Sequence, residues 1–227
     1  MKFLLLDLDD TLLDFGASEA EGLRKTLLSF GIDPTDEIVR RYSEINDAQW
    51  KLLELGKLTR LEVKRRRFEI LFEWLGVERD VEAVRLYYER VLGEFHVFYD
   101  GAEQFLRDVY GKYALYIVSN GTTAVQNGRI ASAGIADYFD GIFLSEEIGY
   151  VKPQREFFEA CFSRIPDFDA SDAIIFGDSL TSDIQGGINA GIRTCWFNPK
   201  RKAGRADIQP DFEVRSLTEF VALLERI

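Results

Sequence analysis

Close to its start the chain reads Lys2-Phe3-Leu4-Leu5-Leu6-Asp7-Leu8-Asp9-Asp10-Thr11. The apolar run is short and stops at an acidic turn, which predicts a buried strand and is too brief for a signal-peptide core. An open parallel sheet binds its ligands beyond the carboxyl ends of its strands. The residues that follow this strand, and those that follow each further strand, are therefore candidate site residues.

Beyond Asp100 the chain alternates short apolar runs with helical segments. The strand candidates are residues 114–118, 141–144, 173–176 and 193–197, and the helical segments are about 122–132, 155–165 and 182–190. Strands that alternate with helices predict right-handed crossovers and a parallel sheet covered on both faces. We expect the strand at the start of the chain to join this sheet, which makes the fold class α/β.

A different pattern separates the first strand from the others. From about residue 19 to residue 92, apolar residues recur at three- and four-residue steps, the period of amphipathic helices. Gly31, Gly56 and Gly76 interrupt this pattern as breaks or C-caps. We therefore predict a helical insert at residues 15–98, inside an α/β core formed by residues 1–14 and 99–227.

The composition excludes several classes of protein. The 227 residues include 28 Lys+Arg and 39 Asp+Glu, a net charge of −11 that argues against a nucleic-acid polymer as partner. No apolar stretch approaches the roughly 18 to 20 residues that cross a bilayer. We expect an intracellular, cytoplasmic protein without a membrane partner.

The scarcity of histidine and cysteine limits the chemistry. His96 is the single histidine, so a histidine relay or a two-histidine metal site would depend on that one ring. Cys161 and Cys195 lack the spacing of a zinc or redox motif and are expected to be buried free thiols. Any catalysis is therefore expected to use carboxylates.

Polar groups follow three of the predicted strands. Beyond Asp7-Leu8-Asp9-Asp10-Thr11 these are Ser119-Asn120-Gly121 and Gly177-Asp178-Ser179, with Asp183 one helical turn later and Lys152-Pro153 between the two. Taken singly, an Asp or Ser after a strand is a routine N-cap or Asx-turn. Together, Asp7, Asp9 and Asp178 would repel by roughly a few kcal/mol per close pair unless a cation lay among them. Oxygen ligands favour Mg²⁺, which prefers a site shared with a phosphate.

In order and spacing, these stretches resemble the four motifs of the haloacid dehalogenase-like (HAD) phosphohydrolase superfamily. The resemblance spans the chain and implies a Rossmann-like, three-layer core whose first strand is central, flanked by the strands that end at Ser119 and Asp178. It also implies that the insert is a helical cap of the C1 type. A glycine cluster occurs at Gly186-Gly187-Ile188-Asn189-Ala190-Gly191. It lacks the Lys-Ser/Thr of a P-loop, and we expect its glycines to end a helix and to allow close packing.

The resemblance implies a role for each matched residue. Asp7 would be the nucleophile that forms an aspartyl-phosphate, and Asp9 would be the general acid and base. Lys152, Ser119 and the amides of Asn120 and Gly121 would hold the phosphoryl oxygens. The expected Mg²⁺ ligands are Asp7, the backbone carbonyl of Asp9 and Asp178, and Asp183 would order them. Dehalogenases of the superfamily lack an acid two residues after the nucleophile, so Asp9 favours phosphate chemistry.

Several stretches are similar to the pyrimidine 5′-nucleotidases of this superfamily, which hydrolyse UMP, dUMP and dTMP. They are Asn46-Asp47-Ala48-Gln49-Trp50, residues 56–69, residues 145–149 and residues 182–191, of which the last two are shared with N-acylneuraminate-9-phosphatases. Asn46 and Trp50 lie four residues apart on one helix face, where an aromatic ring and an amide would contact a base. The alternative places Trp50 in the core and Asn46 in solvent.

Further cap and loop residues are candidates for substrate contact. The run Lys64-Arg65-Arg66-Arg67 is expected to be a solvated helix face, with Arg67 as an exception that points into the cleft. Phe15 and Tyr150 flank the active loops and are expected to be lid aromatics.

The sequence thus predicts a Mg²⁺-dependent phosphomonoesterase for a small phosphorylated metabolite, a pyrimidine nucleoside monophosphate. A capped phosphatase for a sugar or acid phosphate, of the N-acylneuraminate-9-phosphate or phosphoglycolate type, is the alternative. A non-catalytic Mg²⁺- and phosphate-binding regulatory module is a further one, because a fold does not dictate a function.

Overall fold

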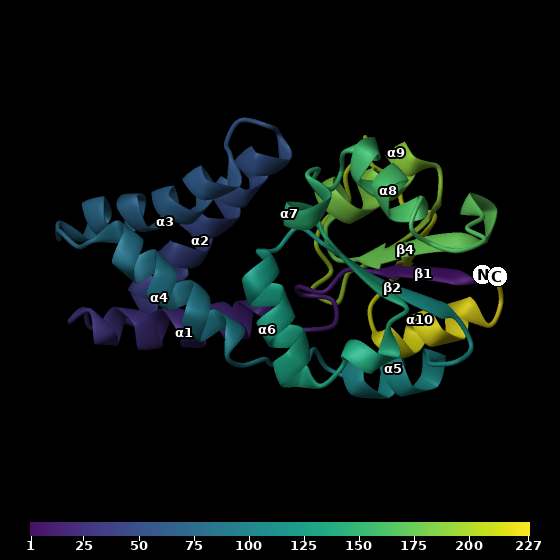
Figure 1. Cartoon of the computed structure of the whole chain (residues 1–227), viewed down its shortest axis with the longest axis horizontal. Coiled ribbons are helices and arrows are strands. Elements are labelled where there is room, and N and C mark those ends of the chain that lie inside the picture. Colours follow the sequence, from purple (N-terminus) through teal and green to yellow (C-terminus); the bar gives the residue numbers. More distant parts are fainter.

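The computed structural model describes all 227 residues and contains one six-stranded parallel sheet, in the order β3-β2-β1-β4-β5-β6 (Figure 1). The strands are β1 (Phe3–Leu6), β2 (Ala114–Ser119), β3 (Gly141–Leu144), β4 (Ala173–Gly177), β5 (Arg193–Phe197) and β6 (Phe212–Val214). The buried strand β1 pairs with β2 and β4, as predicted. Only β6 was not expected, because three residues are too short to show a strand pattern.

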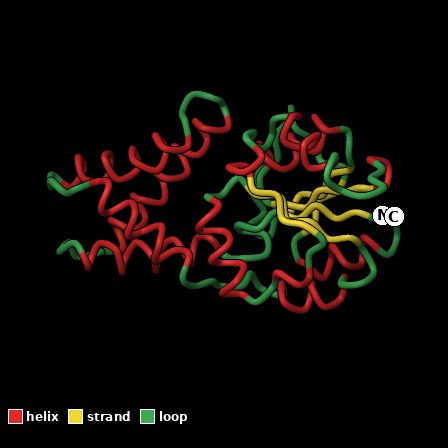
Figure 2. Tube along the Cα trace, viewed as in Figure 1, coloured by secondary structure: helices red, strands yellow, loops and turns green.

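Helices cover both faces of the sheet, which gives three layers (Figure 2). They are α5 (Ala102–Val109), α6 (Thr123–Ala133), α7 (Ser145–Ile148), α8 (Arg155–Phe162), α9 (Gln185–Ala190) and α10 (Leu217–Leu224), with short helical turns at Ala136–Tyr138, Ala170–Asp172 and Leu180–Ile184. No helix is both long and apolar enough to cross a bilayer.

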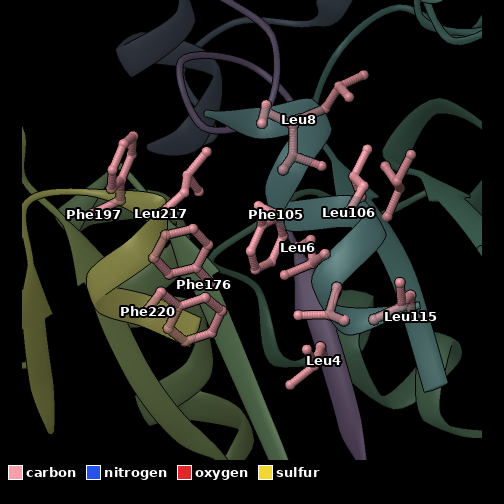
Figure 3. Close-up of a cluster of buried hydrophobic side chains, with 14 of the residues drawn as sticks. Leu4, Leu6, Leu8, Phe105, Leu106, Leu115, Phe176, Phe197, Leu217 and Phe220 are labelled. Carbon is pink, nitrogen blue, oxygen red and sulfur yellow. The ribbon is translucent and has the colours of Figure 1, made fainter. Parts of the chain in front are cut away.

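Alternate residues of β1 serve the two layers, because successive side chains of a strand point to opposite faces. Leu4 and Leu6 pack with residues of α5 and α10, such as Phe105 and Phe220 (Figure 3). Phe3 and Leu5 belong to a second cluster, which includes residues of α8. Both faces of β1 are therefore apolar, and polar residues appear only where the strand ends.

Four helices form a separate bundle beside the sheet: α1 (Phe15–Ser29), α2 (Asp36–Glu54), α3 (Arg60–Leu75) and α4 (Val81–Gly93) (Figure 1). They enclose their own apolar cluster, in which Leu23, Tyr42, Phe68 and Tyr88 are buried. The two chain segments that connect the bundle to the sheet run side by side, since Leu13 forms an antiparallel bridge with Phe98. The division of the chain at residues 14 and 99 stays a prediction.

The glycine cluster on α9 packs against the sheet. A Cβ added to Gly187 would lie 2.5 Å from Cγ2 of Ile175 and 2.6 Å from Cγ2 of Thr194. Gly191 ends the helix with a φ of 72°. Both features agree with the expected helix end and close packing.

We expect Gly187→Ala to lower the free energy of unfolding by about 1–3 kcal/mol, because an added methyl group overpacks the contact between α9 and the sheet. Urea denaturation measures the change. Gly204→Ala is the matched control, since an added Cβ there has no atom within 4 Å. The control should shift stability by less than about 0.5 kcal/mol, and equal losses in the two variants would contradict the packing argument.

Candidate active site

The carboxyl ends of three neighbouring strands meet at one edge of the sheet. Asp7 follows β1, Ser119 ends β2 and Asp178 follows β4. The Asp7 amide donates to the carbonyl of Phe176 at 2.9 Å, which extends the pairing of β1 with β4. All three acid and hydroxyl side chains line one cavity of about 350 Å³, together with residues of the helical bundle.

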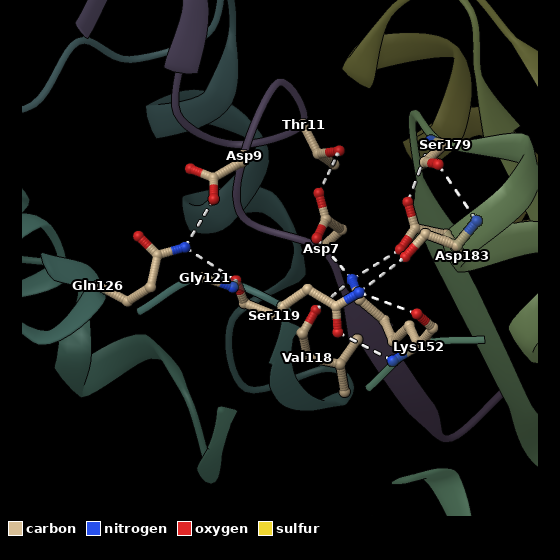
Figure 4. Close-up of polar contacts among 12 residues, drawn as sticks. Asp7, Asp9, Thr11, Val118, Ser119, Gly121, Gln126, Lys152, Ser179 and Asp183 are labelled. Atoms are coloured by element: carbon tan, nitrogen blue, oxygen red, sulfur yellow. Dashed lines mark hydrogen bonds and ion pairs between the residues drawn. The ribbon is translucent and has the colours of Figure 1, made fainter. Parts of the chain in front are cut away.

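Lys152 is buried beneath this cavity and binds two carboxylates (Figure 4). Its Nζ donates to Oδ1 of Asp7, Oδ1 of Asp183 and the carbonyl of Val118, each at 2.7 Å. Burial acts to lower the pKa of Lys152, but the two carboxylates outweigh it and raise that pKa above its usual value. The ammonium group is therefore a fixed positive charge beside Asp7.

The backbone of Lys152 is fixed by Asn120. The Asn120 side chain accepts from the Lys152 amide at 2.8 Å and donates to the Lys152 carbonyl at 2.9 Å. The motif after β2 thus positions the lysine in addition to presenting its own polar groups.

Three carboxylates form an acidic cluster: Asp7, Asp178 and Asp183 each offer an oxygen, and these atoms lie within 4.8 Å of one another. Burial raises the pKa of Asp7 well above its usual value and the pKa of Asp178 to about 7, although Lys152 and Lys202 respectively act in the opposite direction. Burial therefore disfavours the ionised form of these carboxylates, and a cation among their oxygens would stabilise that form.

The donor set fits a divalent cation with oxygen ligands. Both oxygens of Asp183 already have partners, since Oδ1 accepts from Lys152 and Oδ2 accepts from the Ser179 amide at 3.0 Å. Both oxygens of Asp7 have partners as well, since Oδ1 accepts from Lys152 at 2.7 Å and Oδ2 accepts from Thr11 Oγ1 at 3.2 Å. The Asp178 carboxylate accepts only from Lys202, through Oδ2, and the Asp9 carbonyl accepts no backbone hydrogen bond. Asp183 connects Lys152 to the loop after β4, which suits it as the residue that orders the ligands.

The Asp9 side chain lies outside the acidic cluster. Figure 4 shows its carboxylate turned toward Gln126 of α6 and away from Asp183. Gln126 Nε2 donates to Oδ2 of Asp9 at 2.7 Å, and Arg129 pairs with Oδ1. Gln126 and Arg129 were not predicted as site residues, although their three-residue spacing places two polar side chains on one face of a helix.

The family model of haloacid dehalogenase-like hydrolases matches residues 1–191. The chain belongs to this family. In this chain, three of the four motifs named above follow strands β1, β2 and β4, and Lys152-Pro153 follows α7.

Three relatives resemble this HAD hydrolase over nearly the whole chain. YfnB of Bacillus subtilis, a HAD-hydrolase by name, is 41% identical over 98% of this chain and 95% of its own length. The crystal structure of YfnB bound to magnesium matches with a TM-score of 0.94 and covers 98% of each chain. The pyrimidine 5′-nucleotidases PynA of Streptococcus pneumoniae and YjjG of Escherichia coli are 38% and 32% identical, over 99% and 98% of this chain and 95% and 97% of theirs. From its family and these relatives, the present HAD hydrolase is a phosphatase.

The helical bundle supplies the other wall of the cavity. Four of the predicted substrate residues line it: Phe15, Asn46, Trp50 and Arg67. Glu19 and Glu54 also line it, and no pattern in the sequence singled them out. These residues of the bundle lie across the cavity from the acidic cluster. Phe15, Glu19, Asn46, Trp50, Glu54 and Arg67 are called the roof of the cavity below.

Asn46 is the centre of a hydrogen-bond network in this roof. Its Nδ2 donates to Oε1 of Glu19 at 2.7 Å, and its Oδ1 accepts from Trp50 Nε1 and Arg67 Nη1, each at 3.1 Å. Asn46 is buried and Trp50 is half-buried, so the alternative that placed Asn46 in solvent and Trp50 in the core is wrong. The amide of Asn46 thus positions Glu19, Trp50 and Arg67, of which Trp50 is the most exposed.

Two expectations for the HAD hydrolase differ from the structure. Tyr150 is 46% exposed and does not line the cavity, because Gly149 ends α7 with a φ of 87° and turns the chain outward. Lys64 is buried and pairs with Glu89 at 3.4 Å and Glu146 at 3.6 Å, whereas the sequence placed it on a solvated face. Arg65 and Arg66 of the same run are exposed, as expected.

A further residue connects the bundle to the phosphate-binding motif. Arg60, at the start of α3, donates to the Asn120 carbonyl and to Oγ of Ser145, both at 2.5 Å. The position of α3 over the site therefore depends on a contact with the loop after β2.

Proposed function

We propose that this phosphatase hydrolyses pyrimidine nucleoside 5′-monophosphates and depends on Mg²⁺. The observation that carries the proposal is the buried Asp7 carboxylate, held beside Lys152 and within an acidic cluster, beneath a polar cavity of about 350 Å³. That volume lies in the range of about 300–1,000 Å³ typical of small-molecule sites. Similarity over nearly the whole chain to two relatives named pyrimidine 5′-nucleotidases supports the choice of substrate.

Asp7 and Asp9 act in both steps of the proposed hydrolysis. In the first step Asp7 attacks phosphorus, the bond from phosphorus to the 5′ oxygen breaks, and Asp9 gives a proton to that oxygen. In the second step Asp9 takes a proton from water, which attacks phosphorus and restores Asp7. Ser119 binds the phosphoryl oxygens throughout, and Lys152, whose three N–H donors already bind Asp7, Asp183 and the Val118 carbonyl, stabilises them by its charge.

Asp7, Asp178 and the Asp9 carbonyl are the proposed Mg²⁺ ligands, and Asp183 orders them through Lys152 and the Ser179 amide. When bound, Mg²⁺ supplies positive charge that stabilises the charge on the phosphoryl group. Lys152 adds a second positive charge from within the protein, which favours the ionised form of Asp7 and helps to hold the phosphate in line with it.

The roof of the cavity is the proposed base site. Trp50 and Phe15 offer aromatic surfaces, and Arg67 lines the same cavity as a buried cation. Base stacking on such rings contributes about 1–3 kcal/mol. Asn46 and Glu19 hold Trp50 and Arg67 in place through the network described above.

A phosphate-release panel on the purified protein tests the proposal. We expect turnover of UMP, dUMP and dTMP that is lost in EDTA and restored by added Mg²⁺. AMP and N-acylneuraminate 9-phosphate should have kcat/KM values lower by more than about tenfold. Best turnover of a sugar or acid phosphate would overturn the nucleotidase assignment, and activity that persists in EDTA would overturn the metal dependence. No release from any ester would favour a binding module.

A further inference from the structure

We propose that Gln126 and Arg129 are positioning residues for Asp9, which they hold at both carboxylate oxygens on the side of the site away from the acidic cluster. The proposal rests on the proposed function, because Asp9 has a proton to transfer only if the enzyme hydrolyses a phosphate ester. Neither residue belongs to the four motifs, and both lie on α6.

Arg129 is a buried charge whose one acidic partner is Asp9. Its side chain is 0% exposed, whereas the Asp9 side chain is 28% exposed and faces the cavity. Nη1 binds Oδ1 of Asp9 and Oε1 of Gln126, while Nε and Nη2 have no hydrogen-bond partner. Phe15 lies beside the guanidinium group, with 5.5 Å between Cζ and the ring centroid.

This arrangement is unfavourable for stability alone. A buried guanidinium with unpaired donors loses hydration that one ion pair does not fully replace. An apolar side chain of similar length would fill the same space without that cost. Packing therefore does not account for an arginine at this position, whereas the fixed location of Asp9 does.

Gln126 holds the second oxygen of Asp9 and connects it to the phosphate-binding motif. Its Nε2 donates to Oδ2 of Asp9 at 2.7 Å and to Oγ of Ser119 at 2.8 Å. Its Oε1 accepts from Arg129 at 3.2 Å. One amide thus sets the position of the acid and base relative to a group that binds phosphate.

The loop after β2 is shaped to admit Gln126. A Cβ on Gly121 would lie 2.4 Å from Nε2 of Gln126 and 2.5 Å from its Cδ. Any other residue at this position would displace the glutamine. The glycine of the second motif therefore serves the Asp9 contact as well as the phosphate.

Helix α6 is a firm support for both side chains. It carries Ile130 in the core cluster of the sheet and Val125 in the cluster of the helical bundle. A Cβ on Gly128 would lie 2.4 Å from the Gly93 carbonyl, so α6 approaches the end of α4 closely. A proton donor or acceptor needs such support, because a misplacement of about 1 Å can cost roughly 10²-fold in rate.

A double-mutant cycle with Asp9→Asn tests the proposal. We expect Arg129→Met to lower kcat by roughly 10²-fold with little change in KM. Gln126→Met should lower kcat similarly and also raise KM, because it removes the donor to Ser119. In the Asp9→Asn background the same changes should lower kcat by less than about threefold, because the residue through which they act has lost its function. Arg155→Met, which removes an exposed arginine paired with Glu159, is the matched control and should leave kcat unchanged.

The cycle is measured with UMP and with p-nitrophenyl phosphate, so that a wrong nucleotide assignment still leaves an ester to follow. Losses that multiply with that of Asp9→Asn would overturn the proposal while leaving the phosphatase function intact. A wild-type protein that hydrolyses neither ester would overturn both. Circular dichroism confirms that each variant is folded, and Gln126→Met decides the question if Arg129→Met does not fold.

Discussion

Asp7→Asn is expected to abolish phosphate release, with a loss of at least about 10⁴-fold in kcat. The asparagine keeps the size of the side chain and an oxygen for Lys152, but an amide does not attack phosphorus to form an acyl-phosphate. The variant should stay folded, because the buried position retains a hydrogen-bond partner for the lysine at the contact of 2.7 Å. Phosphate release from UMP under saturating Mg²⁺ measures the effect.

Asp9→Asn tests the role of the second carboxylate of the first motif separately from that of Asp7. If Asp9 acts as acid and base, its loss should cost about 10² to 10⁴-fold, less than the loss of the nucleophile. Asp108→Asn, a change at a half-buried acid on α5 outside the site, should leave kcat unaltered. Slight and equal losses at Asp7 and Asp9 would contradict the roles proposed for them.

Lys152→Met should lower the free energy of unfolding by about 3–5 kcal/mol when EDTA is present. The lysine side chain is 2% exposed and is the ammonium partner of both Asp7 and Asp183. Removing it leaves two buried carboxylates close together without a compensating charge, which is the costly way to break a buried ion pair. Urea denaturation of the variant and the wild type gives the difference.

Two further measurements serve as controls for the expected loss of stability in Lys152→Met. Lys202→Met removes a lysine that is 54% exposed and pairs with Asp178 at 3.0 Å, and it should cost less than about 1 kcal/mol. Added Mg²⁺ should stabilise Lys152→Met more than it stabilises the wild type, because the cation replaces part of the missing charge. If Lys152→Met and Lys202→Met lower the free energy of unfolding by the same small amount, Lys152 does not compensate the buried carboxylates in the way described.

The sequence by itself determined the position of the site in the fold. Asp7, Ser119 and Asp178 each follow an apolar run, and parallel strands place their carboxyl ends at one edge of the sheet. The periodicity of residues 19–92 likewise predicted helices, and four helices form there. These features depend on local patterns of burial, which a linear sequence displays directly.

Only the tertiary structure decided which side chains meet. Asp9 contacts residues 117 and 120 positions away, on a helix whose own pattern does not identify its partner. The burial of Lys64 and the network around Asn46 arise in the same way, from helices that pack across one another. Tyr150 has an aromatic ring next to a motif, yet the turn at Gly149 directs it to solvent. Periodicity in the sequence indicates which face of a helix or strand is buried. The partner of a polar side chain depends instead on the distance and angle between elements that are far apart in the chain.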